Sequence, residues 1–231
     1  MCLLQGGAAR KAALQSPPAE DFRPQVSTFL AIPTRGSVHH QIARAAEELG
    51  HELDTEPVYF EGNLSIVYNR NQICSAFLDT DHSSLVMLDD DVLPHPDAYR
   101  LVDWLSQGWD LVSAAVPIWN PQLWETPIFN AFKDNKPLSP SLGNWQEEPI
   151  EAHQVGTGLV AIRRSVVEQL SEGQSPFRDA TVGSQYFSED ILFCEDARDA
   201  GFRIGCDFTL ECDHWKNVSL RRVIDLIVGR T

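Results

Sequence analysis

Three consecutive carboxylates, Asp89–Asp91, directly follow the short apolar run Leu85–Leu88. The run has the length and residue types of a buried strand, and Pro94 and Pro96 stop the strand from continuing beyond the acidic triplet. Carboxylates that crowd the end of a buried strand repel one another unless something neutralises them. Oxygen ligands suit Mg²⁺ or Mn²⁺, so the triplet indicates either a metal site that holds a phosphate or a solvated acidic turn.

A second acidic pair, Glu189-Asp190, follows Ser188 where a helix is expected to begin. This helix is expected to run to Ala200 and to stop at Gly201. In one interpretation, Ser188 is the N-cap and the two acids complement the positive end of the helix dipole. In the other, the helix keeps a carboxylate ionised and aimed, so that it takes a proton from a hydroxyl nucleophile. The residues alone leave both interpretations open.

A histidine, His214, follows the strand expected over Phe202–Phe208. A histidine at a strand end either makes structural hydrogen bonds or binds a metal. A zinc site built from Cys206, Cys212 and His214 is a further alternative. Its spacing matches no usual zinc finger, and a fourth ligand is not evident.

These groups lie at the ends of expected strands and helices. The first strand, Ser27–Ile32, ends in the turn Pro33–Gly36, and such a turn is the usual place for a phosphate or nucleotide in an open α/β sheet. The later strands are expected at Thr55–Phe60, Leu85–Leu88, Asp110–Val116, Gly156–Ile162 and Phe202–Phe208. The first helix is expected to follow the N-cap Ser37 and to stop at Gly50, and the third to follow the cap Asp97 and to stop at Gly108. The other helices are expected to begin at Asn69–Asn71 and to span Ser165–Leu170, Ser188–Ala200 and Val218–Val228. This alternation predicts a mostly parallel central sheet with helices on both faces.

The chain is expected to form a mobile tail over residues 1–26 and one domain over residues 27–231. Residues 117–149 are rich in proline and poor in periodicity, which predicts an irregular insertion or lid with a short hairpin at Thr126–Phe132 and Pro137-Leu138. Its tryptophans either stack on a sugar ring or pack over the sheet edge; they are Trp119, Trp124 and Trp145. The glycines of Gly156-Thr157-Gly158 allow either a close backbone approach to a ligand or an ordinary tight bend.

Composition excludes several classes of protein. The chain has 231 residues, 43% of them hydrophobic, which predicts a globular body with a sizeable core. A net charge of -15 disfavours a broad surface that binds nucleic acid or anionic lipid, because such surfaces are basic. It does not exclude a nucleic acid as the acceptor, bound through a local basic patch. Five cysteines without a CxxC pair favour a reducing compartment, so a cytoplasmic location is expected. No apolar run approaches the ~20 residues of a membrane span.

The order of these motifs is more specific than any one of them. Over roughly residues 27–216 it resembles the GT-A fold glycosyltransferases, in particular family-2-like enzymes. The motifs that carry the resemblance are Pro33-Thr34-Arg35, Arg70-Asn71, Asp89–Asp91, Gly156-Thr157-Gly158, Ser188-Glu189-Asp190 and Cys212–Trp215.

The resemblance implies a single GT-A-like, Rossmann-like domain that transfers a sugar from a nucleotide-sugar donor, a UDP- or GDP-sugar, to an acceptor hydroxyl with the help of Mn²⁺ or Mg²⁺. By this likeness the metal would bind Asp91 and His214, and Asp190 with Glu189 beside it would supply the catalytic base. The nucleotide pocket would be lined by Pro33, Thr34, Arg35 and Arg70. Asp89 would face the ribose or the sugar, and the donor site would also include Asp90, Gly156, Thr157 and Gly158.

Two alternatives belong to other classes. A GT-A-like module that binds a ligand without turnover would carry the same motifs. The acidic strand end also resembles the start of a haloacid-dehalogenase phosphatase, in which an aspartate attacks phosphate. That motif requires Thr or Val where Leu93 stands, and it usually lies near the N-terminus rather than after more than eighty residues.

Overall fold

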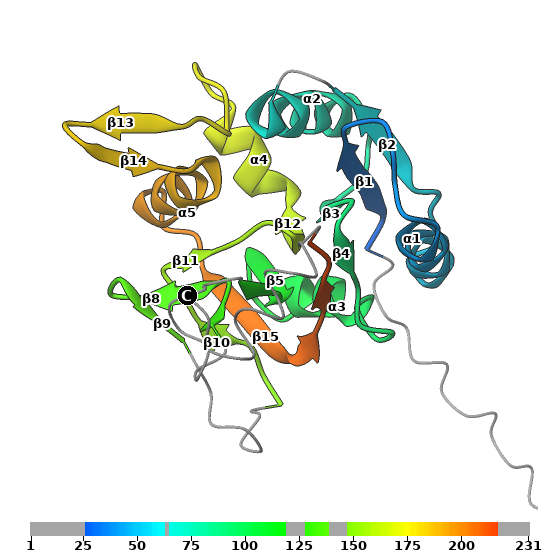
Figure 1. Ribbon diagram of the computed structural model, residues 1–231. Helices are drawn as coiled ribbons and strands as arrows, with labels where there is room; N and C mark the ends of the chain where they lie inside the picture. Colours follow the sequence, from blue (N-terminus) through cyan, green and yellow to red (C-terminus); the bar gives the residue numbers. More distant parts are fainter. Residues whose placement is uncertain (1–25, 63–64, 119–127, 139–146, 217–231) are drawn as a thin grey trace, which may run out of the picture.

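The computed structural model describes residues 26–62, 65–118, 128–138 and 147–216. Its centre is a seven-stranded sheet (Figure 1). The strands in spatial order are β10 (Ile150–Glu151), β15 (Ile204–Glu211), β5 (Leu111–Ala115), β12 (Leu159–Arg163), β3 (Ser84–Leu88), β1 (Thr28–Thr34) and β2 (Val58–Glu61). Strands β2, β1, β3, β5 and β15 run in one direction, whereas β12 and β10 run against them. The expected mostly parallel α/β sheet is therefore confirmed.

Helices cover both faces of the sheet, because successive strand residues point to opposite sides. In β3, Leu85 and Met87 face one core, whereas Val86 and Leu88 face the other. The first core packs against α2, α4 and α5, and the second against α1 and α3. The bounds are α1 (His40–Glu52), α2 (Ile66–Leu78), α3 (Arg100–Ser106), α4 (Arg164–Leu170) and α5 (Glu189–Asp199).

Short strand pairs join distant segments around the sheet. They are β16 (Asp213–His214) with β4 (Val92–Leu93), β6 (Pro117–Ile118) with β7 (Ile128–Phe129), β11 (Gln154–Val155) with β8 (Ala131–Lys133), β8 with β9 (Lys136–Pro137), and β13 (Ala180–Val182) with β14 (Gln185–Phe187). The β8–β9 hairpin turns through Asp134 and Asn135, whose φ angles are 51° and 58°. Two left-handed residues between paired strands form the tight turn that matches strand twist. A hairpin is thus present in the segment 117–149, but its strands are 131–133 and 136–137 rather than the expected 126–132 and 137–138.

Several expected boundaries are wrong by a few residues. The cap of α1 is His39 rather than Ser37, because the His39 ring accepts a hydrogen bond from the Gln41 amide at 3.3 Å. Gly50 does not end α1 but lies inside it. A Cβ at Gly50 would stand 2.6 Å from the Thr55 carbonyl oxygen, so the glycine is required by close packing rather than by a turn.

The second helix also begins earlier than expected. The Ser65 hydroxyl caps α2 by accepting from the Tyr68 amide at 3.1 Å, and this places Arg70 in the second turn instead of at the helix start. Helix α3 begins at Arg100 rather than directly after Asp97, and β2 lies three residues beyond the expected Thr55 start. The predicted helix over 218–228, residues 1–25 of the predicted tail over 1–26, and the three tryptophans at 119, 124 and 145 lie outside the described residues.

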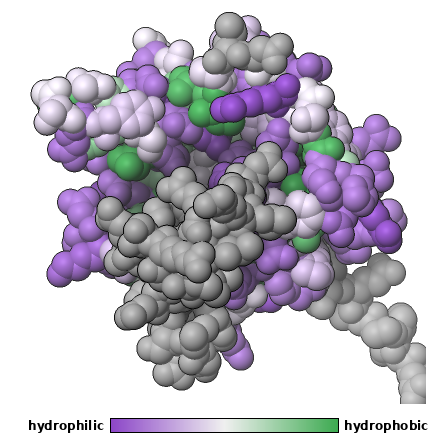
Figure 2. Space-filling view, viewed as in Figure 1, coloured by the Kyte–Doolittle hydropathy of each residue, from purple (hydrophilic) through white to green (hydrophobic). Residues whose placement is uncertain are grey.

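The surface gives two further observations. Within the described ranges, none of the helices combines the length and apolar composition that crossing a bilayer requires. On the face shown in Figure 2, the described surface is mainly hydrophilic, and its hydrophobic residues form small separate patches.

Candidate functional site

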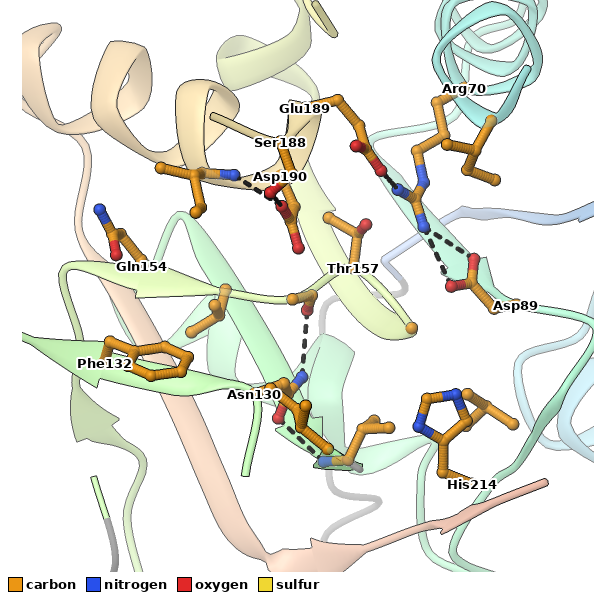
Figure 3. A pocket seen from close by; sticks show the side chains of 18 of the residues that line it. Arg70, Asp89, Asn130, Phe132, Gln154, Thr157, Ser188, Glu189, Asp190 and His214 are labelled. Carbon is orange, nitrogen blue, oxygen red and sulfur yellow. Dashed lines mark hydrogen bonds and ion pairs between the residues drawn. The ribbon is translucent and has the colours of Figure 1, made fainter. Parts of the chain in front are cut away.

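Two adjoining cavities open at the ends of β1 and β3, and they contain nearly all of the residues singled out in the sequence. The inner cavity has a volume of about 570 Å³, and the outer cavity about 600 Å³. Ile66 and Asp89 line both. The expected site residues that line the inner cavity with charged or hydroxyl side chains include Arg70, Asp89, Thr157, Glu189, Asp190 and His214 (Figure 3). The outer cavity is lined by Thr34, Arg35, Asp90, Asp91 and Lys216, with Pro33 beside them.

A buried ion triad joins three elements at the back of the inner cavity. The Arg70 guanidinium on α2 is only 4% exposed and donates to both oxygens of Asp89, at 2.9 and 3.0 Å. Its other terminal nitrogen donates to Glu189 at the start of α5. Burial raises the pKa of Asp89 and of Glu189 above the ordinary values, although Arg70 partly offsets this effect. Burial alone would lower the pKa of Arg70, but the two carboxylates raise it, so the guanidinium remains charged.

The triad fixes the place of two expected site residues. Arg70 does not line the outer cavity with Pro33, Thr34 and Arg35; it lines the inner cavity, and both of its terminal nitrogens bind carboxylates. Glu189 is bound to Arg70, so this ion pair links the start of α5 to α2.

Arg70→Leu is expected to destabilise the fold by about 3–5 kcal/mol, because it leaves two buried carboxylates without their cation. Urea unfolding measures this loss. Arg44→Ala is the matched control, since Arg44 pairs with Glu48 at 2.9 Å on the exposed side of α1, and exposed pairs contribute less than about 1 kcal/mol. Equal losses for the two variants would contradict the assigned importance of the triad.

Asp190 presents a free carboxylate oxygen to the inner cavity. Its Oδ1 accepts from the Ile191 amide at 2.8 Å and from the Ser188 hydroxyl. Ser188 occupies the N-cap position as expected, but its side chain makes no capping bond and turns to Asp190 instead. Oδ2 of Asp190 has no hydrogen-bond partner among the described residues, and Figure 3 shows the side chain pointing into the cavity. The arrangement suits proton abstraction from a bound hydroxyl.

Asp91 and His214 meet because β16 pairs with β4. His214 Nε2 lies 3.4 Å from Asp91 Oδ1, while its Nδ1 lies 2.8 Å from the Pro117 carbonyl oxygen. Lys216 Nζ lies 2.5 Å from the other Asp91 oxygen. Burial alone would raise the pKa of Asp91, but hydrogen bonds and charge from His214 and Lys216 lower it to about 2. The hydrogen bond with Asp91 in turn raises the pKa of His214.

The donor set for a metal is therefore a carboxylate with an imidazole. These are two ligand types that Mn²⁺ accepts, and the shared Asp91–His214 contact places them at one point. In the described ranges, no group of three or more His, Cys, Asp or Glu side chains converges as a metal site. The zinc alternative is accordingly wrong: Cys206 and Cys212 are buried free thiols, and burial raises the pKa of Cys212 to about 12.

The end of β1 lines the outer cavity. β1 continues through Pro33 and Thr34, two residues beyond the expected strand end at Ile32, because both residues pair with β2. The Arg35 amide approaches Asp90 Oδ2 at 3.4 Å, so this strand end and the acidic triplet lie side by side. The buried Asn69 amide donates to the Thr34 carbonyl oxygen at 3.3 Å. Two exposed basic residues, Arg35 and Lys216, line this cavity beside the carboxylates of Asp89, Asp90 and Asp91. Lys216 and Asn69 carry no sequence pattern that singles them out.

The Gly156–Gly158 turn forms part of the wall of the inner cavity. The Gly158 carbonyl accepts from the Asp89 amide at 2.8 Å, and the Asn130 side chain donates to the Gly156 carbonyl at 3.2 Å. Added Cβ atoms at Gly156 and Gly158 would meet Asn130 Cβ at 3.0 Å and Val92 Cγ2 at 3.3 Å. The close approach that these glycines permit is thus to the protein itself. Asn130 was not expected from the sequence, because a buried amide in an irregular segment leaves no periodic signal.

Comparison with solved structures identifies the fold. The crystal structure of A197 from STIV superposes with a TM-score of 0.56 at 20% identity, over 82% of this chain and 86% of that one. GalNAc-T7, solved with UDP, GalNAc and Mn²⁺, superposes with a TM-score of 0.53 at 14% identity, over 88% of this chain and 48% of that one. The fold is GT-A-like. At these identities the likeness shows the fold alone, and the chain spans about half the length of GalNAc-T7. No protein-family model and no curated protein sequence matches the chain.

Proposed function

We propose that this protein is a metal-dependent glycosyltransferase of the family-2-like type, which moves a sugar from a nucleotide-sugar donor to an acceptor hydroxyl. The observation that carries the proposal is the placement of Asp190 and His214 on opposite sides of one cavity (Figure 3). The proposed proton acceptor Asp190 would thus lie across the cavity from the proposed metal ligand His214. An inverting sugar transfer requires such a separation, because the hydroxyl then attacks the anomeric carbon from the side opposite the leaving diphosphate.

The proposed donor site is the outer cavity with its inner margin. Arg35 and Lys216 supply positive charge for a diphosphate, and Pro33 and Thr34 form the wall where the base and ribose would lie. Asp91 and His214 would hold Mn²⁺ or Mg²⁺, which when bound offsets the negative charge that develops on the leaving diphosphate. Asp89 borders both cavities, so its place between nucleotide and sugar fits the proposed contact with the ribose or the sugar. The proposed donor site also includes Asp90 from the outer cavity and Gly156, Thr157 and Gly158 from the inner one.

The chain's own residues perform the remaining steps. The Arg70 triad holds the start of α5 in place, and Ser188 orients the Asp190 carboxylate by donating to Oδ1. The free Oδ2 takes the proton of the acceptor hydroxyl as the oxygen forms its bond to the anomeric carbon. UDP- and GDP-sugars are the proposed donors, and the solved complex of GalNAc-T7 with UDP and Mn²⁺ supports a metal-bound diphosphate on this fold. The proposed compartment is the cytoplasm, in keeping with the free buried thiols.

A phosphatase of the haloacid-dehalogenase kind fits the geometry less well. Such an enzyme requires a free nucleophilic aspartate at the end of the central strand. Here both oxygens of Asp89 accept hydrogen bonds from a buried guanidinium, so neither is left free to act as the nucleophile.

The test of the proposal is donor hydrolysis with Mn²⁺ across a panel of UDP- and GDP-sugars, followed by release of the free nucleoside diphosphate. We expect at least one donor to be hydrolysed slowly, and EDTA to abolish the reaction. Tight binding of a nucleotide sugar without any turnover would identify a binding module instead. Release of inorganic phosphate from phosphate monoesters would identify a phosphatase.

A further inference from the structure

The part of the inner cavity beside Asp190 has walls unlike those of the donor side. It is formed by Phe132, Asn135 and Gln154, which come from the β8–β9 hairpin and from β11. Figure 3 shows Phe132 and Gln154 beyond Asp190, on the side away from Asp89. Among the described residues that line the inner cavity, the basic side chains are Arg70, which is bound to two carboxylates, and His214. This end of the cavity is therefore neutral and polar, with one aromatic face.

Thr157 lines the same cavity on the other side of Asp190 from Phe132 and Gln154. Its side chain is 2% exposed, lines the cavity, and has no hydrogen-bond partner for Oγ1 in the described part of the chain. In Figure 3 it lies between Asp190 and Asp89. A buried hydroxyl without a partner is a cost to the folded protein. A ligand that brings a hydroxyl to this position would remove that cost on binding.

The charges of the inner cavity restrict the chemistry of that ligand. Three carboxylates, Asp89, Glu189 and Asp190, line the inner cavity beside the basic side chains of Arg70 and His214. Arg70 pairs with Asp89 and Glu189, whereas Asp190 forms no ion pair within the described part of the chain, so its negative charge faces the cavity. An acceptor that carries phosphate groups would be repelled here. A neutral molecule meets no such penalty, and its hydroxyl reaches the free oxygen of Asp190.

The neutral side chains match the two faces of a sugar ring. The aromatic ring of Phe132 provides a flat apolar surface for the C–H face of a pyranose. The amide of Asn135, which lies in the turn of the β8–β9 hairpin, provides both a donor and an acceptor for hydroxyls. Gln154 donates to Glu195 Oε1 at 3.3 Å, which anchors its amide and leaves its carbonyl oxygen free to accept from a hydroxyl.

We propose that Phe132, Asn135, Gln154 and Thr157 form an acceptor subsite for a neutral sugar, with Asp190 facing the hydroxyl that is glycosylated. This inference rests on the proposed glycosyltransferase function and names its acceptor class. It excludes phosphorylated sugars and nucleic-acid strands as acceptors at this subsite.

The test is binding of methyl glycosides, measured by ligand-observed NMR titration with no donor or metal present. The panel contains neutral methyl glucoside, galactoside, mannoside and N-acetylglucosaminide, with glucose 1-phosphate, a threonine-containing peptide and a short oligonucleotide as competitors of other classes. We expect at least one neutral glycoside to bind, and the anionic probes and the peptide to bind at least tenfold more weakly.

Two variants examine the assigned contacts. Phe132→Ala should weaken glycoside binding about tenfold, and Phe132→Leu should weaken it comparably while keeping an apolar side chain for folding. Tyr186→Ala is the aromatic control, since Tyr186 is 61% exposed on β14 and does not line the cavity. Thr157→Val should weaken binding about five- to tenfold and leave the melting temperature of the free protein unchanged or higher, because a buried unpartnered hydroxyl becomes a methyl group. A purely structural threonine would not give these opposite changes.

The inference is overturned if none of the glycosides binds, if the anionic probes or the peptide bind as well as the glycosides, or if the Phe132 and Thr157 variants bind like wild type. Donor hydrolysis separates this outcome from failure of the proposed function. An enzyme that hydrolyses a nucleotide sugar and binds no neutral glycoside keeps the proposed function and loses only the acceptor class.

Discussion

Asp190→Asn is expected to lower turnover about 100-fold or more while donor affinity stays close to normal. A general base contributes roughly 10²–10⁴ to a rate, and this contribution exists only in the transition state. The substitution also preserves the local geometry. The amide oxygen of asparagine can take the place of Oδ1, which accepts from Ile191 and Ser188, so the lost function is confined to the free oxygen that faces the cavity.

Measuring turnover, donor affinity and melting temperature on the same variant separates chemistry from helix stability. If Asp190 merely complements the dipole of α5, the change should cost at most about 1 kcal/mol and leave the rate nearly unaltered. Asp199→Asn is the matched control, because Asp199 is an exposed carboxylate at the other end of the same helix. Near-normal turnover with a slightly lowered melting temperature for Asp190→Asn would show that the carboxylate is structural.

The strands of this fold were largely predictable because their signal is local. Leu85–Leu88 and Leu159–Ile162 are apolar runs that end at Asp89 and begin after Gly158, and both form central strands as expected. Strand direction has no such signal. An apolar run is buried equally well in either orientation, so the antiparallel setting of β12 between β3 and β5 was not predictable from composition.

The residues of the candidate site also divide into those that the sequence predicts and those that it does not. Asp89–Asp91 follow strand β3 and Asp190 lies in the first turn of helix α5, and both positions could be predicted from the local sequence. The structure places these residues around two joined cavities. The ion pair of Arg70 with Glu189 could not be predicted from the sequence. The two residues are 119 positions apart, and an ion pair between two helices produces no characteristic sequence spacing. Thr157 is similar: it is one of many threonines, and its unpartnered hydroxyl becomes evident only when its surroundings are known.

Asp91→Ala is expected to abolish the part of nucleotide binding that depends on Mn²⁺, together with donor turnover. The variant removes one of the two proposed metal ligands and leaves His214 as the other, and a single imidazole holds a divalent cation weakly. Lys216 would keep its charge beside the outer cavity, so some metal-independent attraction for a diphosphate is expected to remain. Nucleotide affinity should therefore become equal with Mn²⁺ and with EDTA.

The stability of this variant separates a lost ligand from a lost fold. The pKa of Asp91 lies at about 2, below its ordinary range, so its ionised carboxylate stabilises the protein above pH 4 and this contribution disappears as the pH falls toward 2. Because the side chain is 38% exposed, solvent screening reduces the loss in Asp91→Ala at pH 7 to about 1 kcal/mol. A folded variant with a small drop in urea midpoint is thus expected.

The control for net charge is Asp213→Ala, because Asp213 is an exposed carboxylate next to His214 on β16 and lines neither the inner nor the outer cavity. It should retain Mn²⁺-dependent nucleotide binding. Isothermal titration of UDP and GDP into wild type and both variants, with Mn²⁺ and with EDTA, measures the difference directly. Wild-type protein that binds nucleotide equally with and without Mn²⁺, or Asp91→Ala that still responds to Mn²⁺, would remove Asp91 from the metal site and return its contacts with His214 and Lys216 to a purely structural role.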